Sequence, residues 1–214
     1  MITPELEEYI EQHIDKEPEV LHELNRQSHI RFLLGRMASG HWQGRLLKMF
    51  VRMINPKKIL ELGTFTGYSA LAMAEGLQDE EAYVDTIEID DELEPTIREF
   101  LEKSPYGAKV HLHIGKCEEV IEQLGGPWDL VFMDANKRNY PEYYKMCMEH
   151  IPVGGYIIAD NILWDGKVIG PLPKADAAQT QAIRDFNDIV ANDPHAEKVI
   201  IPLRDGLTII RKTS

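Results

Sequence analysis

The sequence predicts an α/β protein with a mostly parallel sheet of seven strands, helices on both faces and an antiparallel last strand. Two observations support this prediction. From Lys57 onward, short apolar runs alternate with segments of helical periodicity, which is the pattern of a parallel α/β sheet. Near the end the alternation stops, and two strand-like runs, 198–203 and 207–211, are separated only by Arg204-Asp205-Gly206. Asp-Gly between apolar runs indicates a hairpin, so the last strand is expected to run antiparallel.

Three helices are expected before the sheet begins. Thr3 is a suitable N-cap for the first, and Pro4 suits its first turn because the N–H that proline lacks would be unpaired there anyway. Apolar residues then recur at helical spacing, which predicts helices over 19–35 and 43–54, with a loop at 38–41 between them.

Strands and helices alternate through the rest of the chain. Strands are expected at 58–62, 83–89, 109–114, 128–134 and 155–161. Helices are expected at 67–76, 91–103, 117–124, 140–150 and 177–192. With the final hairpin, these elements predict a single domain over 1–214, in which 1–45 form a helical cap and 46–214 the core.

Charge and composition argue against several classes of protein. The chain has 23 basic and 36 acidic residues, and its net charge of −13 disfavours nucleic acid and anionic membranes as partners. No apolar stretch approaches the roughly 20 residues of a membrane span, and the first residues lack the pattern of a signal peptide. Cys117 and Cys147 form neither a disulfide framework nor a metal motif. A cytoplasmic protein is therefore expected.

Polar side chains end two of the predicted strands. The run 128–134 ends at Asp134, and the run 155–161 ends at Asp160 and Asn161. Because the carboxyl ends of parallel strands face the ligand crevice, these side chains are expected to converge if the strands are near neighbours. Three oxygen donors suit Mg²⁺ or Ca²⁺. Lys137 follows closely enough after Asp134 to handle a proton beside the metal.

Several candidate side chains also have an ordinary structural interpretation. Asp134 at a strand end is a common helix cap, and Lys137 taken alone is a solvated lysine at a helix start. Trp164 either covers the core or walls an acceptor pocket. His111 and His113 share one face of a strand without an evident third ligand, so we interpret them as sheet-surface residues.

A second group of features points to a nucleoside cofactor. The first strand-to-helix turn has the pattern Gly63-x-x-x-Gly67, not the Gly-x-Gly-x-x-Gly that places a pyrophosphate on a helix N-terminus. The second strand ends at Glu88, where an acid can bind two ribose hydroxyls, and Asp90 is expected to cap the next helix. A cofactor base could pack at Gly115 to Cys117, although Cys117 is equally a small buried residue. Together with the hairpin, these features favour S-adenosylmethionine.

The strand count and the terminal hairpin resemble the Rossmann-like sheet of class I S-adenosylmethionine-dependent methyltransferases. From about Met37 to the C-terminus, the chain further resembles the cation-dependent O-methyltransferases, which include catechol and caffeoyl-CoA O-methyltransferases, and it looks most similar to their small bacterial members. The motifs that carry this resemblance are Glu61-Leu62-Gly63 with Gly67-Tyr68-Ser69, Ile87-Glu88, Met133-Asp134-Ala135-Asn136-Lys137, Ala159-Asp160-Asn161, the run 161–168 and the stretch 180–184.

The resemblance implies an enzyme that transfers the methyl group of S-adenosylmethionine to a hydroxyl of a small aromatic vicinal diol. It implies a divalent cation, with Mg²⁺ expected and Ca²⁺ or Mn²⁺ as alternatives, on Asp134, Asp160 and Asn161. Catalysis would rest on Lys137 as general base, beside Asp134. The residues implied around the cofactor are Met37, Ser39, Glu61, Gly63, Phe65, Ser69, Glu88, Ile89, Gly115, Cys117 and Asp134. A homodimer is also implied, which a monomer in light scattering would refute.

The chain departs from the catechol enzyme at the acceptor. The aromatic residues that clamp the catechol ring align with Gly35 and Asn136, and a carboxylate that helps bind the second hydroxyl aligns with Thr208. A simple catechol is therefore not the expected acceptor.

Two other functions stay open. Some bacterial relatives methylate a hydroxylated tRNA uridine, for which Arg45, Lys48, Lys57 and Lys58 would supply a local basic patch against the overall charge. Methylation of bulk tRNA would identify that function. The third is a non-catalytic protein that binds metal or cofactor on the same scaffold, which loss of motif residues would favour. None of the metal or base positions is lost.

Overall fold

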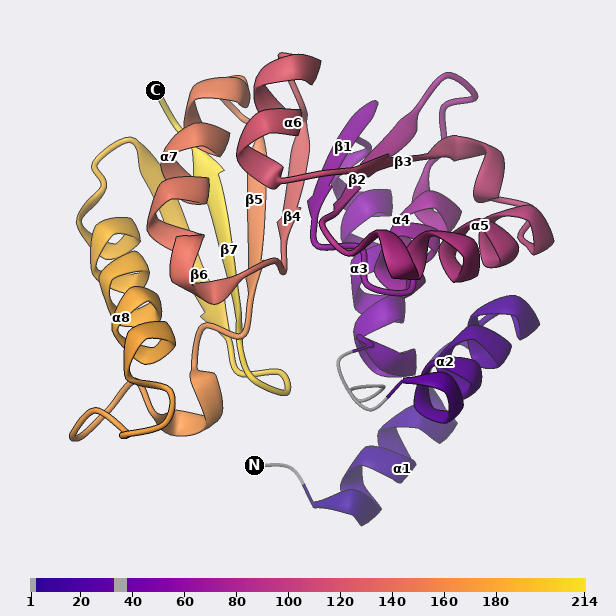
Figure 1. The fold of residues 1–214 in the computed structure, drawn as a ribbon, viewed down its shortest axis with the longest axis horizontal. Helices are drawn as coiled ribbons and strands as arrows, with labels where there is room; N and C mark the ends of the chain where they lie inside the picture. The colour runs from indigo at the N-terminus through magenta and orange to yellow at the C-terminus, as the bar shows by residue number, and fades with distance from the viewer. Residues whose placement is uncertain (1–2, 33–37) are drawn as a thin grey trace. The chain divides into compact units, whose positions relative to one another are not determined.

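The computed structural model describes residues 3–32 and 38–214 (Figure 1). Their contacts group into two compact units. The first unit comprises residues up to 57 together with 64–114, and the second comprises 58–63 together with 115–214. In the part of the chain that the structure describes, no helix has both the length and the apolar character needed to cross a bilayer.

The first unit is mainly helical. Its helices are α1 (Pro4–His13), α2 (Glu19–Arg31), α3 (Gly40–Ile54), α4 (Tyr68–Gly76) and α5 (Glu94–Lys103), with single turns at Asp91–Leu93 and Gly107–Lys109. Its strands β2 (Tyr83–Glu88) and β3 (Val110–Ile114) are parallel neighbours. Helices α3 and α4 approach closely at Gly44, where an added Cβ would lie only 2.7 Å from the Tyr68 ring.

The second unit contains the remaining five strands. These are β1 (Lys58–Leu62), β4 (Leu130–Met133), β5 (Tyr156–Asp160), β6 (Ala196–Ile201) and β7 (Leu207–Lys212). Its helices are α6 (Cys117–Leu124), α7 (Tyr140–His150) and α8 (Ala177–Asn192), with single turns at Lys137–Asn139 and Trp164–Gly166. Helices α6, α7 and α8 lie alongside these strands (Figure 1).

The strands form one seven-stranded sheet in the order β3-β2-β1-β4-β5-β7-β6. Strands β1, β4 and β5 are parallel neighbours, whereas β7 is antiparallel to both β5 and β6. The Asp-Gly signal marks the turn between β6 and β7, where Gly206 has a φ of +86° and donates its N–H to the Leu203 carbonyl at 2.8 Å. The predicted α/β class, the strand count and the antiparallel last strand are confirmed.

Most predicted boundaries agree with the structure to within a few residues. Thr3 caps α1, since its side chain accepts the N–H of Leu6 at 3.4 Å. The loop predicted at 38–41 is wrong in its second half, because α3 begins at Gly40. There the His41 ring bonds to the Asp15 carbonyl at 2.7 Å, a contact distant in sequence that local periodicity does not reveal. Of the helix predicted at 19–35, the positions after Phe32 lie outside the described residues.

Aromatic packing joins the last two helices of the second unit. Tyr140 and Tyr144 of α7 both meet Phe186 of α8 edge-on, with ring centroids 5.4 and 5.9 Å apart. All three side chains are buried. Edge-to-face geometry favours aromatic pairs beyond the area they bury, so this cluster stabilises the packing of α7 against α8.

Candidate active site

Two acidic residues end neighbouring parallel strands in the second unit. Met133 lies opposite Ala159 in the β4–β5 register, so Asp134 and Asp160 follow at matching positions. Asp160 is only 5 % exposed, and its Oδ1 accepts the N–H of Asn161 at 2.6 Å. Asn161 has a φ of +59°, a left-handed conformation that asparagine adopts more readily than most residues. The structure therefore brings these strand ends together, as the sequence pattern predicts.

Lys137 is paired with the first of these acids. Its Nζ donates to Asp134 Oδ1 at 2.5 Å, with the lysine side chain 13 % exposed and the aspartate 21 % exposed. The same Nζ lies 5.1 Å from the centroid of the Tyr140 ring. Asn136 caps the turn that presents Lys137 by accepting the N–H of Arg138 at 3.2 Å. Lys137 is thus a partly buried, paired cation and not a solvated lysine.

Tyr140 is a residue of this region that the sequence did not single out. Its hydroxyl lies 3.0 Å from the carbonyl oxygens of both Met133 and Asp160. Burial, and next the negative charges of Asp134 and Asp160, raise the pKa of Tyr140 well above its ordinary value, so the hydroxyl keeps its proton. In the sequence, nothing distinguishes this tyrosine from an ordinary aromatic residue at the start of a helix.

The β6–β7 turn holds the loop that follows β5. The N–H groups of Leu163 and Asp165 donate to the backbone oxygen and Oδ1 of Asp205 at 2.9 and 2.5 Å. Gly206 is needed there, because a Cβ would lie 2.5 Å from the Leu163 side chain. Burial raises the pKa of the Asp205 carboxyl, and the nearby charge of Lys137 opposes that rise. Asp205 therefore lies within electrostatic reach of Lys137, which the sequence did not predict.

Trp164 occupies a strained position in this loop. Trp164 and Asp165 have φ values of +48° and +52°, which bulky residues rarely adopt. Lys167 Nζ lies 5.5 Å from the centroid of the indole ring. Among the described residues, the buried Trp164 Nε1 has no hydrogen-bond acceptor. An indole N–H that is buried without a partner suits a ligand oxygen, because an unmet buried donor is costly.

The oxygen donors of the second unit suit a hard divalent cation. The Asp134 and Asp160 carboxylates and the Asn161 amide oxygen are the ligand types that Mg²⁺ and Ca²⁺ prefer. Within 3–32 and 38–214, no three His, Cys, Asp or Glu side chains are grouped so as to hold a metal ion. The predicted site differs from such a group because its third ligand is an amide. The ammonium of Lys137 already compensates the charge of Asp134, as a bound cation would.

The cofactor residues predicted in the second unit lie in or directly after β1 and around the start of α6. Gly63 follows β1 with a φ of +93°, and a Cβ there would lie 2.7 Å from the Asp134 carbonyl oxygen. Glu61 is fully buried within β1. Gly115 follows β3, and Cys117 is buried as the first residue of α6. Only glycine allows this close approach between the two strand ends at position 63.

The cofactor residues predicted in the first unit centre on Glu88. One carboxylate oxygen accepts the N–H of Phe65 at 2.7 Å, and the other accepts those of Ile89 and Asp90, both at 2.9 Å. These donors orient the carboxylate and leave lone pairs for further donors such as ribose hydroxyls. Ser69 is also buried. Asp90 additionally caps the next turn by accepting the N–H of Glu92, as predicted.

The other two predicted positions in this unit lie before α3. Ser39 is buried, whereas Met37 lies outside the described residues.

Helix α2 and the residues on either side of it contact the glycine turn. Ser28 Oγ donates to Thr66 Oγ1 at 2.9 Å, and the Phe32 ring meets the Phe65 ring edge-on at 5.8 Å. Tyr68, directly after the turn, donates its hydroxyl to Glu17. These contacts link the N-terminal helices to residues 64–68, which no local motif in the sequence indicates.

The remaining candidates have ordinary structural partners. His113 Nε2 lies 2.9 Å from Asp85 Oδ1 and His111 Nδ1 lies 3.6 Å from it, so the two histidines share a carboxylate that the sequence did not reveal. The basic patch expected for a tRNA-binding face is wrong in part. Arg45 is buried against Glu75 at 2.6 Å, and Lys48 pairs with the same carboxylate at 2.7 Å.

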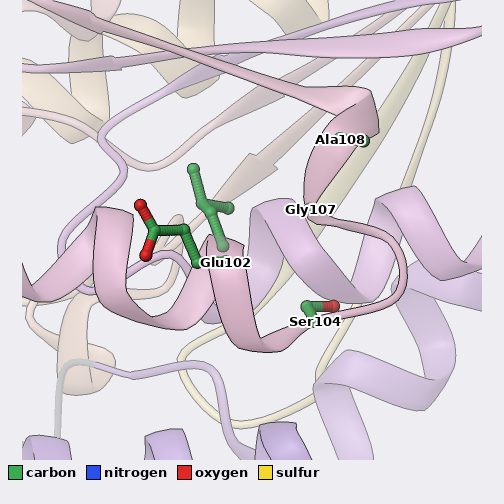
Figure 2. A pocket seen from close by; sticks show the side chains of 5 residues that line it. Glu102, Ser104, Gly107 and Ala108 are labelled. Carbon is green, nitrogen blue, oxygen red and sulfur yellow. The ribbon is translucent and has the colours of Figure 1, made fainter.

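A surface hollow lies elsewhere in the first unit, between the end of α5 and the Gly107–Lys109 turn (Figure 2). It is lined by Leu101, Glu102, Ser104, Gly107 and Ala108. None of the residues predicted for metal, cofactor or base lies in it. The side chains around it include no cluster suited to chemistry, so it does not compete with the strand ends as the candidate site.

Comparison with known proteins identifies the family. The family model for O-methyltransferases matches residues 11–213. The chain belongs to the O-methyltransferase family. This O-methyltransferase is 35% identical over 212 residues to tricin synthase 1 of Oryza sativa subsp. japonica, covering 93% of this chain and 83% of that protein. It is 32% identical over 209 residues to caffeoyl-CoA O-methyltransferase 2 of Petunia hybrida, covering 93% and 86%. These relatives support the cation-dependent group that the sequence motifs predict.

Solved structures agree with this assignment. The S-adenosylhomocysteine-bound methyltransferase PaMTH1 of Podospora anserina has a TM-score of 0.90 at 31% identity, covering 100% of this chain and 99% of that one. The O-methyltransferase TomG of Streptomyces achromogenes, in complex with S-adenosylmethionine, has a TM-score of 0.91 at 28% identity, with 100% of both chains covered. The class I methyltransferase fold and an S-adenosylmethionine-dependent activity are therefore confirmed.

We expect Glu88 to contribute directly to cofactor affinity. Replacing it with alanine removes the carboxylate that is expected to accept the ribose hydroxyls, and it should raise the Kd for S-adenosylmethionine roughly 10- to 100-fold, as measured by calorimetry. Asp90→Ala is the matched control, because it removes an acid two residues away that only caps a turn. Equal losses in the two variants would mean that the turn, and not the ribose contact, is responsible.

Proposed function

We propose that this O-methyltransferase methylates a hydroxyl of a small aromatic vicinal diol held by a divalent cation, with Lys137 as the general base. The supporting observation is that Asp134 and Asp160 end neighbouring parallel strands while the Lys137 ammonium lies on Asp134. The names of the relatives, a tricin synthase and a caffeoyl-CoA O-methyltransferase, support a hydroxylated aromatic acceptor. An acceptor of this class carries two adjacent oxygens that can share one cation.

The proposed reaction is a direct displacement. The acceptor oxygen forms a bond to the methyl carbon of S-adenosylmethionine while the carbon–sulfur bond breaks and its electron pair passes to sulfur. The hydroxyl proton passes to Lys137 Nζ. Asp134, Asp160 and Asn161 would hold a divalent cation, Mg²⁺ in the first instance, which would supply Lewis-acid activation of the hydroxyl.

Residues around Lys137 would prepare it for this role. Lys137 accepts a proton only as the neutral amine, and its ammonium form is now held by Asp134. Asp134 would then have two roles, as a ligand of the cation and as the partner that orients Lys137 Nζ. Alignment of the two reactants would supply much of the remaining rate.

The loop after β5 would contact the acceptor. The buried Nε1 of Trp164 lacks an acceptor among the described residues, so it is available to an oxygen of the substrate. Asn136 replaces the aromatic clamp of the catechol enzyme with a small polar side chain, which favours acceptors larger than a simple catechol. The homodimer expected from the resemblance stays a prediction.

Chelation tests the metal requirement directly. With a caffeoyl-type thioester as acceptor, EDTA is expected to reduce methyl transfer to background and Mg²⁺ to restore it, while calorimetry shows S-adenosylmethionine binding unchanged by EDTA. Asp160→Ala should stay inactive when Mg²⁺ is returned, because a carboxylate ligand is missing. Undiminished transfer in EDTA, or in Asp160→Ala, would contradict the proposal. Parallel reactions with catechols, flavonoids and bulk tRNA identify the acceptor.

A further inference from the structure

We propose that the Tyr140 hydroxyl is a positioning group for the divalent cation, because it ties together the two strand ends that carry Asp134 and Asp160. This inference rests on the proposed metal-dependent function. It assigns to a buried tyrosine a task that neither the sequence motifs nor the donor set reveals.

The Tyr140 hydroxyl lies between the two strand ends. It lies 3.0 Å from the Met133 carbonyl, directly before Asp134, and 3.0 Å from the carbonyl of Asp160 itself. The β4–β5 register ends at the pair formed by Met133 and Ala159. Tyr140 therefore supplies a link between the strands just where the ladder stops and the ligand residues begin. The Tyr140 hydroxyl therefore sets the distance between the Met133 and Asp160 carbonyls. That distance in turn positions the carboxylates of Asp134 and Asp160.

The ring is held firmly enough to act as a fixed link. Tyr140 is fully buried, and its ring meets Phe186 of α8 edge-on at a centroid distance of 5.4 Å. It is also the first residue of α7, directly after the turn that presents Lys137. Groups that hold the ligands of a metal ion, without touching the ion, typically change its affinity by 10- to 100-fold.

Tyr144 provides a matched comparison within the same helix. It lies one turn further along α7, is also buried and also meets Phe186 edge-on, at 5.9 Å. Its hydroxyl donates to Asp193 Oδ2 at 2.7 Å, beyond the end of α8. Tyr140 and Tyr144 thus share burial, ring packing and a bonded hydroxyl, and they differ in whether that hydroxyl joins the strand ends.

The test compares Tyr140→Phe with Tyr144→Phe in the full-length protein. Mn²⁺ binding is measured from the electron paramagnetic resonance signal of the free ion, which requires no turnover. Tyr140→Phe is expected to raise the Kd for Mn²⁺ about tenfold, and Tyr144→Phe to change it less than about twofold. Both should melt a few degrees below wild type, since each loses the hydrogen bonding of a buried hydroxyl. The Kd for S-adenosylmethionine should stay unchanged in both.

Variants at the same position separate the hydroxyl from the ring. Tyr140→4-aminophenylalanine returns an N–H donor and is expected to recover wild-type Mn²⁺ affinity. Tyr140→4-fluorophenylalanine fills the hydroxyl volume without a donor and is expected to bind weakly, and it serves in place of Tyr140→Phe if that variant does not fold. If Mn²⁺ affinity is unchanged in Tyr140→Phe and Tyr140→4-fluorophenylalanine, or falls equally in Tyr144→Phe, the role of the hydroxyl is overturned. The proposed metal site is not affected by either result. A wild-type protein that binds no Mn²⁺ overturns both the metal site and the inference.

Discussion

Replacing Lys137 with methionine is expected to lower kcat for methyl transfer roughly 10²- to 10⁴-fold, the usual contribution of a positioned general base. Methionine keeps an unbranched, partly buried side chain but cannot accept the hydroxyl proton. It also removes the Nζ that now bonds to Asp134 Oδ1 at 2.5 Å. Because Lys137 is predicted to contact neither the metal nor the cofactor, their affinities should change far less than kcat. Single-turnover rates with saturating cofactor and Mg²⁺ measure the chemical step.

The dependence on pH distinguishes a base from a structural cation. As the pH approaches the pKa of the acceptor hydroxyl, solvent produces the phenolate and the deficit of Lys137→Met should narrow. Lys145→Met is the control, since Lys145 is an exposed lysine of α7 that lies 3.8 Å from Glu142 and should be replaceable without loss. A deficit in Lys137→Met that is constant across pH would contradict the assignment of Lys137 as base.

The second large effect concerns stability. Gly107→Ala is expected to lower the free energy of unfolding by roughly 4 kcal/mol or more, which only severe steric or burial defects achieve. A Cβ at position 107 would lie 1.8 Å from the carbonyl oxygen of Leu101 near the end of α5. Because the opposing atoms belong to the backbone, no side-chain rotation relieves the clash. The turn at Gly107–Lys109 and the end of α5 would have to separate, opening the wall of the hollow in Figure 2.

Urea denaturation followed by far-ultraviolet circular dichroism measures this loss. Gly166→Ala is the control, because Gly166 has a φ of +75° but a Cβ there would meet nothing within 4 Å. That variant should lose only about 1–2 kcal/mol, the cost of a left-handed conformation for alanine. A loss in Gly107→Ala no larger than that in Gly166→Ala would show that the chain relieves the contact with Leu101 at little cost.

Local patterns predicted the elements and the strand-end acids well. An apolar run marks each strand, and parallel strands present their ends at one edge, so Asp134 and Asp160 are expected to converge if their strands are neighbours. The structure supplies that adjacency. The Asp205-Gly206 signal likewise specified the hairpin. What local patterns missed depends on chain segments that meet only after folding. Tyr140 reaches the Asp160 carbonyl across 20 positions of sequence, and Asp165 reaches Asp205 across 40.

Contacts between distant segments also account for the wrong start predicted for α3 and for the basic patch that forms only in part. Local sequence does not show that His41 belongs to α3, because the ring bonds to the carbonyl of Asp15, 26 positions away. Arg45 and Lys48 counted as surface cations until the fold placed Glu75 of α4 between them. A sequence shows the sign of a charge but not whether a distant opposite charge will neutralise it.

The position of β7 determines when the sheet can form during translation. In the sheet, β7 lies between β5 and β6, so β6 reaches the sheet only through a strand that is translated after it. A nascent chain that lacks 207–212 leaves β6 without a partner and exposes the edge of β5, which invites pairing with other chains. Truncation at a stop codon before Leu207 should therefore yield aggregates in place of a shortened enzyme.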